Sequence, residues 1–201
     1  MYETMFQPIT IGGLTLKNRI VFAPTTLGLS EEEYREKIRA IAAGGCAMVI
    51  IGDVPVGRHG PMSLYSRKGF AHYQALCRLV HEQGCLICAQ LHQSDSDFKA
   101  MLKYVPGILT RRISMEDLRP LLNQQASKLV TEMSADKVAE IAASFGPAAV
   151  RAAEAGFDMV QVHGDRMCGS FSSALMNHRT DRYGGSPQNR ARFAVEAVTA
   201  V

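Results

Sequence analysis

The stretch Asn177–Arg190, which reads NHRTDRYGGSPQNR, is the most informative part of this 201-residue chain. It follows an apolar run that ends at His163 and precedes a segment with apolar residues at helical spacing. Its content of arginine, glycine and other polar residues predicts a segment outside the core. A solvated loop that caps a helix fits these residue types, and so does a loop that carries function.

Apolar runs alternate with helical patterns on both sides of this stretch. A Gly12-Gly13 pair between two short alternating segments predicts a tight hairpin over Phe6–Leu16. The apolar runs predict strands at 19–24, 46–52, 85–91 and 157–163. The first of these reads as a strand buried on both faces. Strands that alternate with helices predict an α/β protein with a parallel sheet, in one continuous domain.

The helices that follow these strands have recognisable starts. Ser30 and Glu33 form a capping box, and Ser134 precedes the third helix. Ser186 followed by Pro187 predicts the start of the fourth. Gly146-Pro147 interrupts the third helix and predicts either a kink or a second helix that begins at Pro147.

Two further features concern periodicity. Residues 93–133 are poorly periodic, which predicts a long loop that is functional or mobile. The last helix is expected to bury one apolar face, made of Phe193, Ala194, Ala197 and Val201.

Composition excludes several classes of protein. The net charge is +3 and the 22 basic residues are spread along the chain, so no basic run predicts nucleic-acid binding. No apolar run approaches the roughly 18 residues of a membrane span. Met1–Pro8 lacks the charged and apolar regions of a signal peptide. These features favour a cytoplasmic protein that acts on small molecules.

Cysteine usage agrees with a reducing compartment. The chain has five cysteines, and Cys85 and Cys88 have the CxxC spacing. They lie in a predicted strand, where positions three apart face opposite sides, so the two thiols cannot share a metal. We therefore expect unpaired core cysteines and no metal site.

Together with Arg192 and Phe193, Asn177–Arg190 resembles the signature NxRTDxYGGSxxNRxRF of the old yellow enzyme family, the FMN-dependent NADH:flavin oxidoreductases. The resemblance extends from the hairpin to the last helix. It implies a fold of the TIM-barrel type, of which residues 1–201 would supply the N-terminal hairpin and four β-α units, a half-barrel. It also implies FMN as cofactor, NAD(P)H as electron donor, and hydride transfer to an activated double bond or related acceptor.

Ligands of parallel α/β folds lie at the carboxyl ends of the strands. The first strand end resembles the family's APMT, which implies that Pro24, Thr25 and Thr26 line the flavin and that the Thr26 hydroxyl donates to the ring. The third strand end, Ala89–His92, resembles QLxH, which implies that Gln90 binds the pyrimidine edge. A structural hydrogen bond is the alternative for Gln90.

At the second strand end the resemblance implies a small residue that lets the backbone approach the flavin, and Gly52 suits this. Asp53 is unusual there, because its carboxylate would face an anionic cofactor. It would either lie near the cofactor or cap the following turn.

At the fourth strand end, the sequence VQVHG resembles the start of the family's VEIHGAHGYL. This implies that His163 binds the acceptor and polarises it. The following segment departs from the family, because the usual second histidine or asparagine and the tyrosine proton donor are replaced. Arg166 is a candidate anion or oxygen donor and Cys168 a candidate proton donor. A solvated arginine and a packed cysteine are the alternatives.

Cofactor affinity is expected to be low for residues 1–201 alone. Barrels of this kind hold the cofactor phosphate after strands seven and eight, and the neutral contacts proposed here contribute about 0.5–1.5 kcal/mol each. A rival hypothesis is a non-catalytic half-barrel that acts as an assembly module. Its first and fourth strands would be open edges that recruit a second copy or a separate second half.

Overall fold

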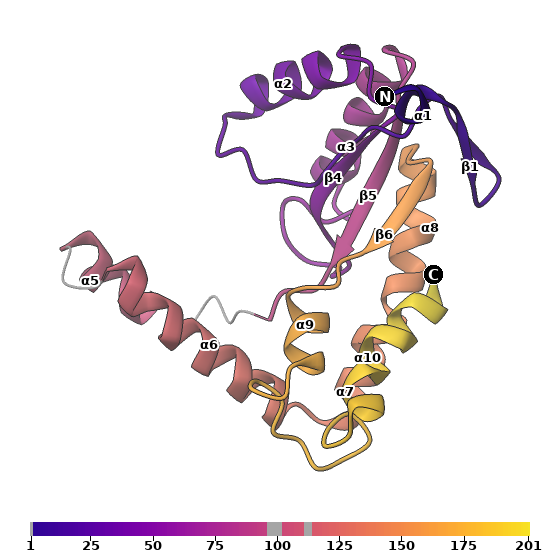
Figure 1. The fold of residues 1–201 in the computed structure, drawn as a ribbon. Coiled ribbons are helices and arrows are strands. Elements are labelled where there is room, and N and C mark those ends of the chain that lie inside the picture. Colours follow the sequence, from indigo (N-terminus) through magenta and orange to yellow (C-terminus); the bar gives the residue numbers. More distant parts are fainter. Residues whose placement is uncertain (1, 96–101, 111–113) are drawn as a thin grey trace. The chain divides into compact units, whose positions relative to one another are not determined.

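The computed structural model describes residues 2–95, 102–110 and 114–201, and they gather in two compact units (Figure 1). The first unit comprises the residues up to Leu91 together with Pro147–Val162. The second comprises His92–Gly146 and His163–Val201. The expected single domain over residues 1–201 stays a prediction.

The first unit opens with helix α1, Glu3–Phe6, and the predicted hairpin. Strands β1, Ile9–Ile11, and β2, Leu14–Leu16, pair antiparallel. The turn between them consists of Gly12 at φ 56° and Gly13 at φ 86°. Two consecutive positive φ angles define the tight turn that glycine adopts without strain, so the hairpin prediction is confirmed.

A four-stranded sheet forms the centre of the first unit. Its strands are β3 (Val21–Phe22), β4 (Met48–Pro55), β5 (Leu86–His92) and β6 (Met159–Val162). They lie in sequential order, and the β3–β4 and β5–β6 pairs are parallel. The four strands occur in the predicted order, although the first is much shorter than residues 19–24, and closure into a half-barrel stays a prediction.

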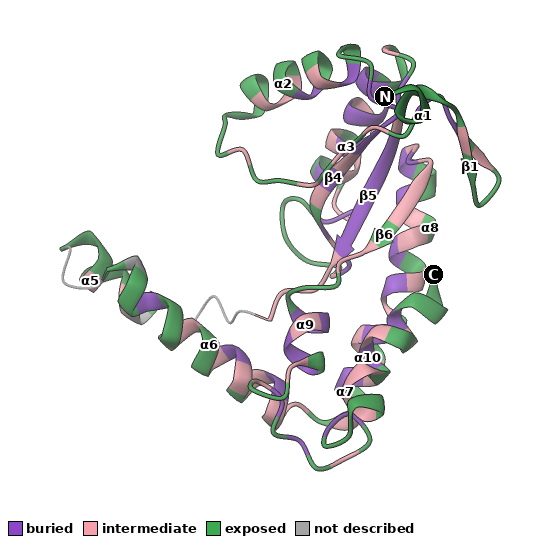
Figure 2. Cartoon of the chain, in the orientation of Figure 1, coloured by how far each residue is buried: buried purple, intermediate pink, exposed green. Residues whose placement is uncertain are grey.

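The two faces of this sheet differ in burial. Side chains on one face are inaccessible, namely Val49, Ile51, Ile87, Ala89 and Leu91. Figure 1 shows helices α3, Arg67–His81, and α8, Phe145–Ala155, behind the strands. On the opposite face Met48 and Cys88 pack against Leu16 of the hairpin, while Ile50 and Met159 are half-buried. Figure 2 shows a largely buried β5 beside a more exposed β6. This half-open face is therefore less completely covered than the one that packs against the helices.

The expectation that residues 19–24 form a strand buried on both faces is wrong. Only Val21 and Phe22 are in β3, and Val21 is 40% exposed. Since β3 is an edge of the sheet, it has β4 as its single neighbour. Pro24 has no N–H to donate, so ladder pairing ends before it.

Local capping signals predict the helices well. Helix α2, Glu31–Ala43, begins with the Ser30–Glu33 capping box, with both reciprocal hydrogen bonds formed. Helix α7, Ala135–Ala143, is capped by Ser134, and a second helix, α8, follows it. The predicted interruption is therefore confirmed, although α8 begins at Phe145, two residues before Pro147.

Helix α10, Pro187–Ala200, begins at the predicted cap, where the Ser186 hydroxyl accepts from the Asn189 N–H. Phe193 and Ala197 are fully buried, as predicted for its apolar face. Val201 lies beyond the helix and is half-exposed, so its assignment to that face is wrong.

The expectation of a long loop over residues 93–133 is largely wrong. A 3-10 turn at Leu102–Tyr104 leads into α5, Val105–Leu109, and residues 115–132 form helix α6, Met115–Glu132. Ser114 and Asp117 form a capping box, with aspartate where glutamate is usual. Residues 96–101 and 111–113, which also belong to the predicted loop, lie outside the described residues. Pro120 inside α6 obscures the helical pattern, because proline disfavours helix interiors.

The signature stretch was expected outside the core, and this is correct for exposed residues such as Arg182 and Gln188 but wrong for others. Asn177, Arg179 and Tyr183 are buried in the second unit. The Asn177 Nδ2 donates to the carbonyls of Phe171 and Tyr183, at 2.7 Å each. Phe171, from helix α9 (Met167–Ser172), stacks on Phe193 of α10 with ring centroids 4.9 Å apart. The polar residues are buried because their hydrogen bonds are satisfied.

Arg179 connects the signature stretch to α6. Its guanidinium donates to the carbonyls of Val130, at 2.7 Å, and Met133 at the end of the helix, and it forms an ion pair with Asp181. The hydrogen bond from Arg179 is the largest influence on Asp181 and lowers the pKa of its carboxyl group. No helix among the described residues is both long and apolar enough to span a membrane.

We predict that Gly184→Ala destabilises the protein by about 2–3 kcal/mol, because overpacking a filled site displaces backbone. A Cβ at Gly184 would lie 2.2 Å from the carbonyl oxygen of Arg179. Gly57→Ala is the matched control, since a Cβ there meets no atom within 4 Å. Urea unfolding of both variants measures the difference. Equal midpoints for the two variants would contradict the packing described.

We also predict a pH-dependent contribution from Asp181. Its folded pKa is lowered, so the Arg179–Asp181 pair stabilises the fold above the unfolded carboxyl pKa of about 3.9. This contribution is lost as the pH falls below that value, through the lower folded pKa. The difference in free energy of unfolding between wild type and Asp181→Asn should therefore shrink as urea titrations move from about pH 6 to about pH 3. A constant difference would refute the assignment.

Candidate functional site

The carboxyl ends of β4, β5 and β6 bring together polar and small residues of the first unit. Gln90 and Gln161 are register partners on neighbouring strands, and the Gln90 Nε2 donates to the Gln161 Oε1 at 2.8 Å. Gln90 is 8% exposed, whereas Gln161 is exposed. Gln90 faces away from the buried side chains Ala89 and Leu91, because strand residues alternate. Its amide therefore lies on the half-open face.

Gly52 and Pro24 lie beside this amide. A Cβ at Gly52 would be 3.2 Å from the Pro24 Cβ and 3.7 Å from the Gln90 Oε1. Three of the predicted cofactor residues therefore meet at one place. The expectation that Gly52 ends its strand is wrong, since β4 continues to Pro55.

The Thr26 hydroxyl has a partner within the protein. It donates to the Asp53 carboxylate at 3.3 Å. Asp53 has φ 56°, a conformation that costs a non-glycine residue about 1–3 kcal/mol and that clusters at functional sites. Thr25 and Thr26 are exposed and Pro24 is half-buried. Donation from Thr26 to a flavin would require its hydroxyl to leave Asp53.

The bare Gly52 and the two amides fit the edge of a flavin ring. The pyrimidine edge alternates donors and acceptors, and a side-chain amide offers both. Gln90 keeps its Oε1 and one N–H after donating to Gln161, so it can still pair with such an edge. Gln161 has no counterpart among the predicted site residues. Gln161 lies directly across from Gln90 because the parallel register of β5 and β6 pairs the two residues.

His163 follows β6 directly and is half-buried. It belongs to the second unit, whereas Thr26, Gly52 and Gln90 belong to the first. The expectation that all four lie along one rim therefore stays a prediction for His163.

Arg166 has an unusual backbone at the start of α9, with φ 53° and ψ −130°. Neighbouring hydrogen bonds hold it there: the Ser170 N–H donates to its carbonyl at 2.8 Å, and the Met167 N–H donates to the Gln93 carbonyl at 3.3 Å. Strain of this kind persists only where the surroundings enforce it, and it often marks functional sites. The Arg166 side chain is exposed and lines a cavity.

Cys168 lies deeper than Arg166. It is buried, and burial raises the pKa of its thiol to about 11. It is not among the residues that line the cavity, so a role as proton donor has weaker geometric support than a role for Arg166. Cys46, Cys77, Cys85 and Cys88 are buried and unpaired as well, which confirms the expected core cysteines. The described ranges contain no cluster of metal-ligating side chains.

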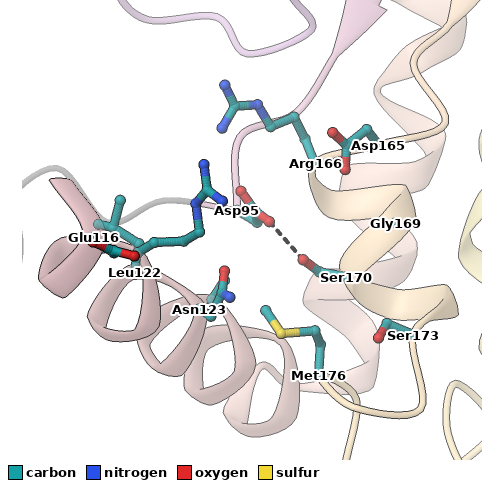
Figure 3. Close-up of a pocket in the computed structure, with 12 residues that line it drawn as sticks. Asp95, Glu116, Leu122, Asn123, Asp165, Arg166, Gly169, Ser170, Ser173 and Met176 are labelled. Carbon is teal, nitrogen blue, oxygen red and sulfur yellow. Dashed lines mark hydrogen bonds between the residues drawn. The ribbon is translucent and has the colours of Figure 1, made fainter.

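The cavity lies within the second unit and has a volume of about 830 Å³ (Figure 3). This is within the range of about 300–1,000 Å³ typical of small-molecule sites. Its lining comes from the segment after β5, from α6 and from the α9 region: Asp95, Glu116, Arg119, Leu122, Asn123, Ala126, Asp165, Arg166, Gly169, Ser170, Ser173 and Met176. Figure 3 shows the Asp95 carboxylate accepting from the Ser170 hydroxyl, at 2.6 Å.

Of these residues, the sequence identified only Arg166. Glu116, Arg119, Leu122, Asn123 and Ala126 were missed because α6 was taken for a loop, and the remaining lining residues carry no signal of their own in the sequence. The Ser114–Asp117 capping box is the signal that could have found this helix and its polar face.

Comparisons with known proteins identify the family of this chain. The family model "NADH:flavin oxidoreductase / NADH oxidase family" matches residues 4–201. A bilirubin reductase of Clostridium symbiosum (strain WAL-14163) is 58% identical over 203 residues, which cover 100% of this chain and 54% of that protein. An NADPH dehydrogenase of Bacillus subtilis (strain 168) is 34% identical over 218 residues, which cover 100% of this chain and 60% of that protein.

A solved structure supports the fold. The old yellow enzyme from Pichia sp. AKU4542 superposes with a TM-score of 0.75 at 25% identity, covering 98% of this chain and 55% of that one. The chain thus spans somewhat more than half the length of the relatives it matches. The family uses FMN with NAD(P)H as electron donor, and the solved neighbour resembles this chain in its α/β fold with a parallel sheet. This chain belongs to the NADH:flavin oxidoreductase / NADH oxidase family, the family of old yellow enzyme.

Proposed function

We propose that the protein to which this chain corresponds transfers hydride from NAD(P)H by way of FMN to an activated double bond. The observation that carries the proposal is the meeting of Gly52, Pro24 and the Gln90 amide on the half-open face of the sheet. The acceptor we favour is a linear tetrapyrrole of the bilirubin type, because a relative 58% identical is named bilirubin reductase.

The first unit would hold the flavin ring. Gln90, oriented by Gln161, pairs with the pyrimidine edge, and Gly52 leaves space for the ring to approach the backbone. Pro24 lies beside Gly52, and Thr25 and Thr26 follow it at the same strand end. Bound FMN supplies the hydride-carrying ring that protein side chains lack.

The second unit would hold the acceptor. His163 is the proposed hydrogen-bond donor to the acceptor's oxygen or nitrogen substituent, which stabilises the charge that develops as hydride is added. Arg166 is the proposed second donor, because it lines the cavity and its strained backbone is held in place. Cys168 is retained as a candidate proton donor with weaker support, since it is buried behind the cavity lining.

The rival hypothesis of a non-catalytic assembly module gains no support from these comparisons. Strands β3 and β6 are the edges of the described sheet, as that hypothesis expects. The same edges are expected in an enzyme whose relatives extend well beyond the matched region. Self-association, or pairing with a separate second half, remains a proposal.

We predict that Gln90→Leu in the full-length protein lowers FMN content at least tenfold. The variant removes the amide that would pair with the flavin, and a buried group left without its hydrogen bond costs about 1–3 kcal/mol, whereas the exposed Gln161 can turn to solvent. Flavin absorbance after gel filtration measures the content. Gln83→Leu, at the opposite end of β5, is the control and should retain flavin. Unchanged flavin in Gln90→Leu would refute the cofactor role.

We predict that His163→Ala retains FMN and lowers kcat/KM for acceptor reduction about 10²- to 10³-fold, the effect of removing one donor to developing charge. Stopped-flow oxidation of the reduced flavin by bilirubin measures this step. His59→Ala, in an exposed loop, should reduce bilirubin normally. A normal rate in His163→Ala would reject this residue as the donor.

A further inference from the structure

The polar face of α6 forms one wall of the cavity in the second unit. Glu116, Arg119 and Asn123 are spaced by three and four residues, so they lie on one side of the helix. All three line the cavity, with Leu122 and Ala126 beside them. A wall that combines charged and apolar side chains suits a ligand with rings and charged substituents.

Arg119 is the arginine that α6 contributes to this wall, and it is exposed. Four arginines elsewhere in the described residues form ion pairs, namely Arg35, Arg39, Arg151 and Arg179, whereas Arg166 on the same cavity does not. Arg119 forms none within 4.0 Å in the described part of the chain, although carboxylates line the same cavity. Its guanidinium is therefore available to an anionic ligand, and this group binds carboxylates in a two-pronged fashion.

The wall is held in place by contacts within the second unit. The Ser127 hydroxyl donates to the Met176 carbonyl at 2.8 Å, which ties α6 to the segment after α9. The Arg179 guanidinium holds the carboxyl end of α6 through the Val130 carbonyl. Preorganisation matters here, because a site that need not be ordered on binding retains more of its interaction energy.

We propose that Arg119 binds a carboxylate of the acceptor and thereby determines which acceptors the enzyme takes. The ligand class is a linear tetrapyrrole with carboxylate side chains. Its carboxylate would pair with Arg119, its rings would pack on Leu122 and Ala126, and its N–H groups would donate to the cavity carboxylates Glu116 and Asp165. The proposal rests on the proposed function and names Arg119 as the residue that binds the carboxylate of the same acceptor.

The mixed charge of the cavity selects among anions. Asp95, Glu116 and Asp165 oppose the two arginines, so a compact polyanion such as phosphate is repelled. A ligand that carries both a carboxylate and N–H donors satisfies both kinds of group. Bilirubin has these features, whereas its dimethyl ester keeps the N–H groups and loses the carboxylate charge.

The test compares these two acceptors with the full-length enzyme. Arg119→Gln should raise KM for bilirubin about ten- to hundredfold, the cost of a lost charge-assisted hydrogen bond, with kcat little changed. KM for the dimethyl ester should stay the same. Arg119→Lys should recover part of the loss, because it restores charge without the fork. Lys128→Gln, on the same helix but outside the cavity lining, is the matched control and should behave as wild type.

A neutral acceptor distinguishes a wrong role for Arg119 from a wrong proposed function. Cyclohexenone, a neutral activated alkene, reports hydride transfer independently of the carboxylate. If wild type reduces bilirubin and Arg119→Gln has an unchanged KM for it, the role of Arg119 is refuted. If wild type reduces neither bilirubin nor cyclohexenone, the proposed function is wrong. Calorimetric titration with bilirubin then still tests whether Arg119 contributes to binding. Equal affinities of wild type and Arg119→Gln in that titration would overturn the proposal.

Discussion

The second unit depends on one buried cation. The Arg179 guanidinium is 7% exposed, and its burial is tolerable only because Asp181 neutralises it and the last carbonyls of α6 accept its N–H groups. Asp181 is partly exposed, but its removal would leave the buried Arg179 charge without a counterion, which destabilises a fold. The same interaction satisfies carbonyls that the end of a helix leaves unpaired. It thereby fixes α6, and with it one wall of the cavity.

A second constraint comes from the alternation of side chains along the strands. Residues such as Ala89 and Leu91 face the helices and are fully buried, which leaves Gln90 for the opposite face. Parallel register then sets Gln161 directly across from Gln90. The hairpin covers the amino-terminal part of that face through Leu16. The carboxyl-terminal part is left half-open, and there Gly52 and the amides meet.

Features that depend on residues nearby in the sequence could be predicted, whereas features that depend on contacts between separate elements could not. The Gly12-Gly13 turn and the Ser30 cap require only their neighbours, and both form as expected. The exposure of β3 was misjudged, because an apolar run predicts burial on both faces although an edge strand has a single partner strand. Among candidate site residues, Gln90 was found by its resemblance to a motif. Arg119 was missed, because Pro120 disguised the helix that carries it.

Two arginines show that the residues that identify the family differ from those proposed to select the acceptor. Arg179 lies in the stretch that identifies the family. Its guanidinium pairs with Asp181 and donates to backbone carbonyls, so it is not available to a ligand. This signature residue therefore stabilises the packing of the second unit. Arg119, on the helix that Arg179 holds, has no ion-pair partner within the described residues and lines a cavity of about 830 Å³. Arg119 is exposed, so solvent meets its charge until a ligand replaces that solvent, and the proposed selection of the acceptor would rest on α6.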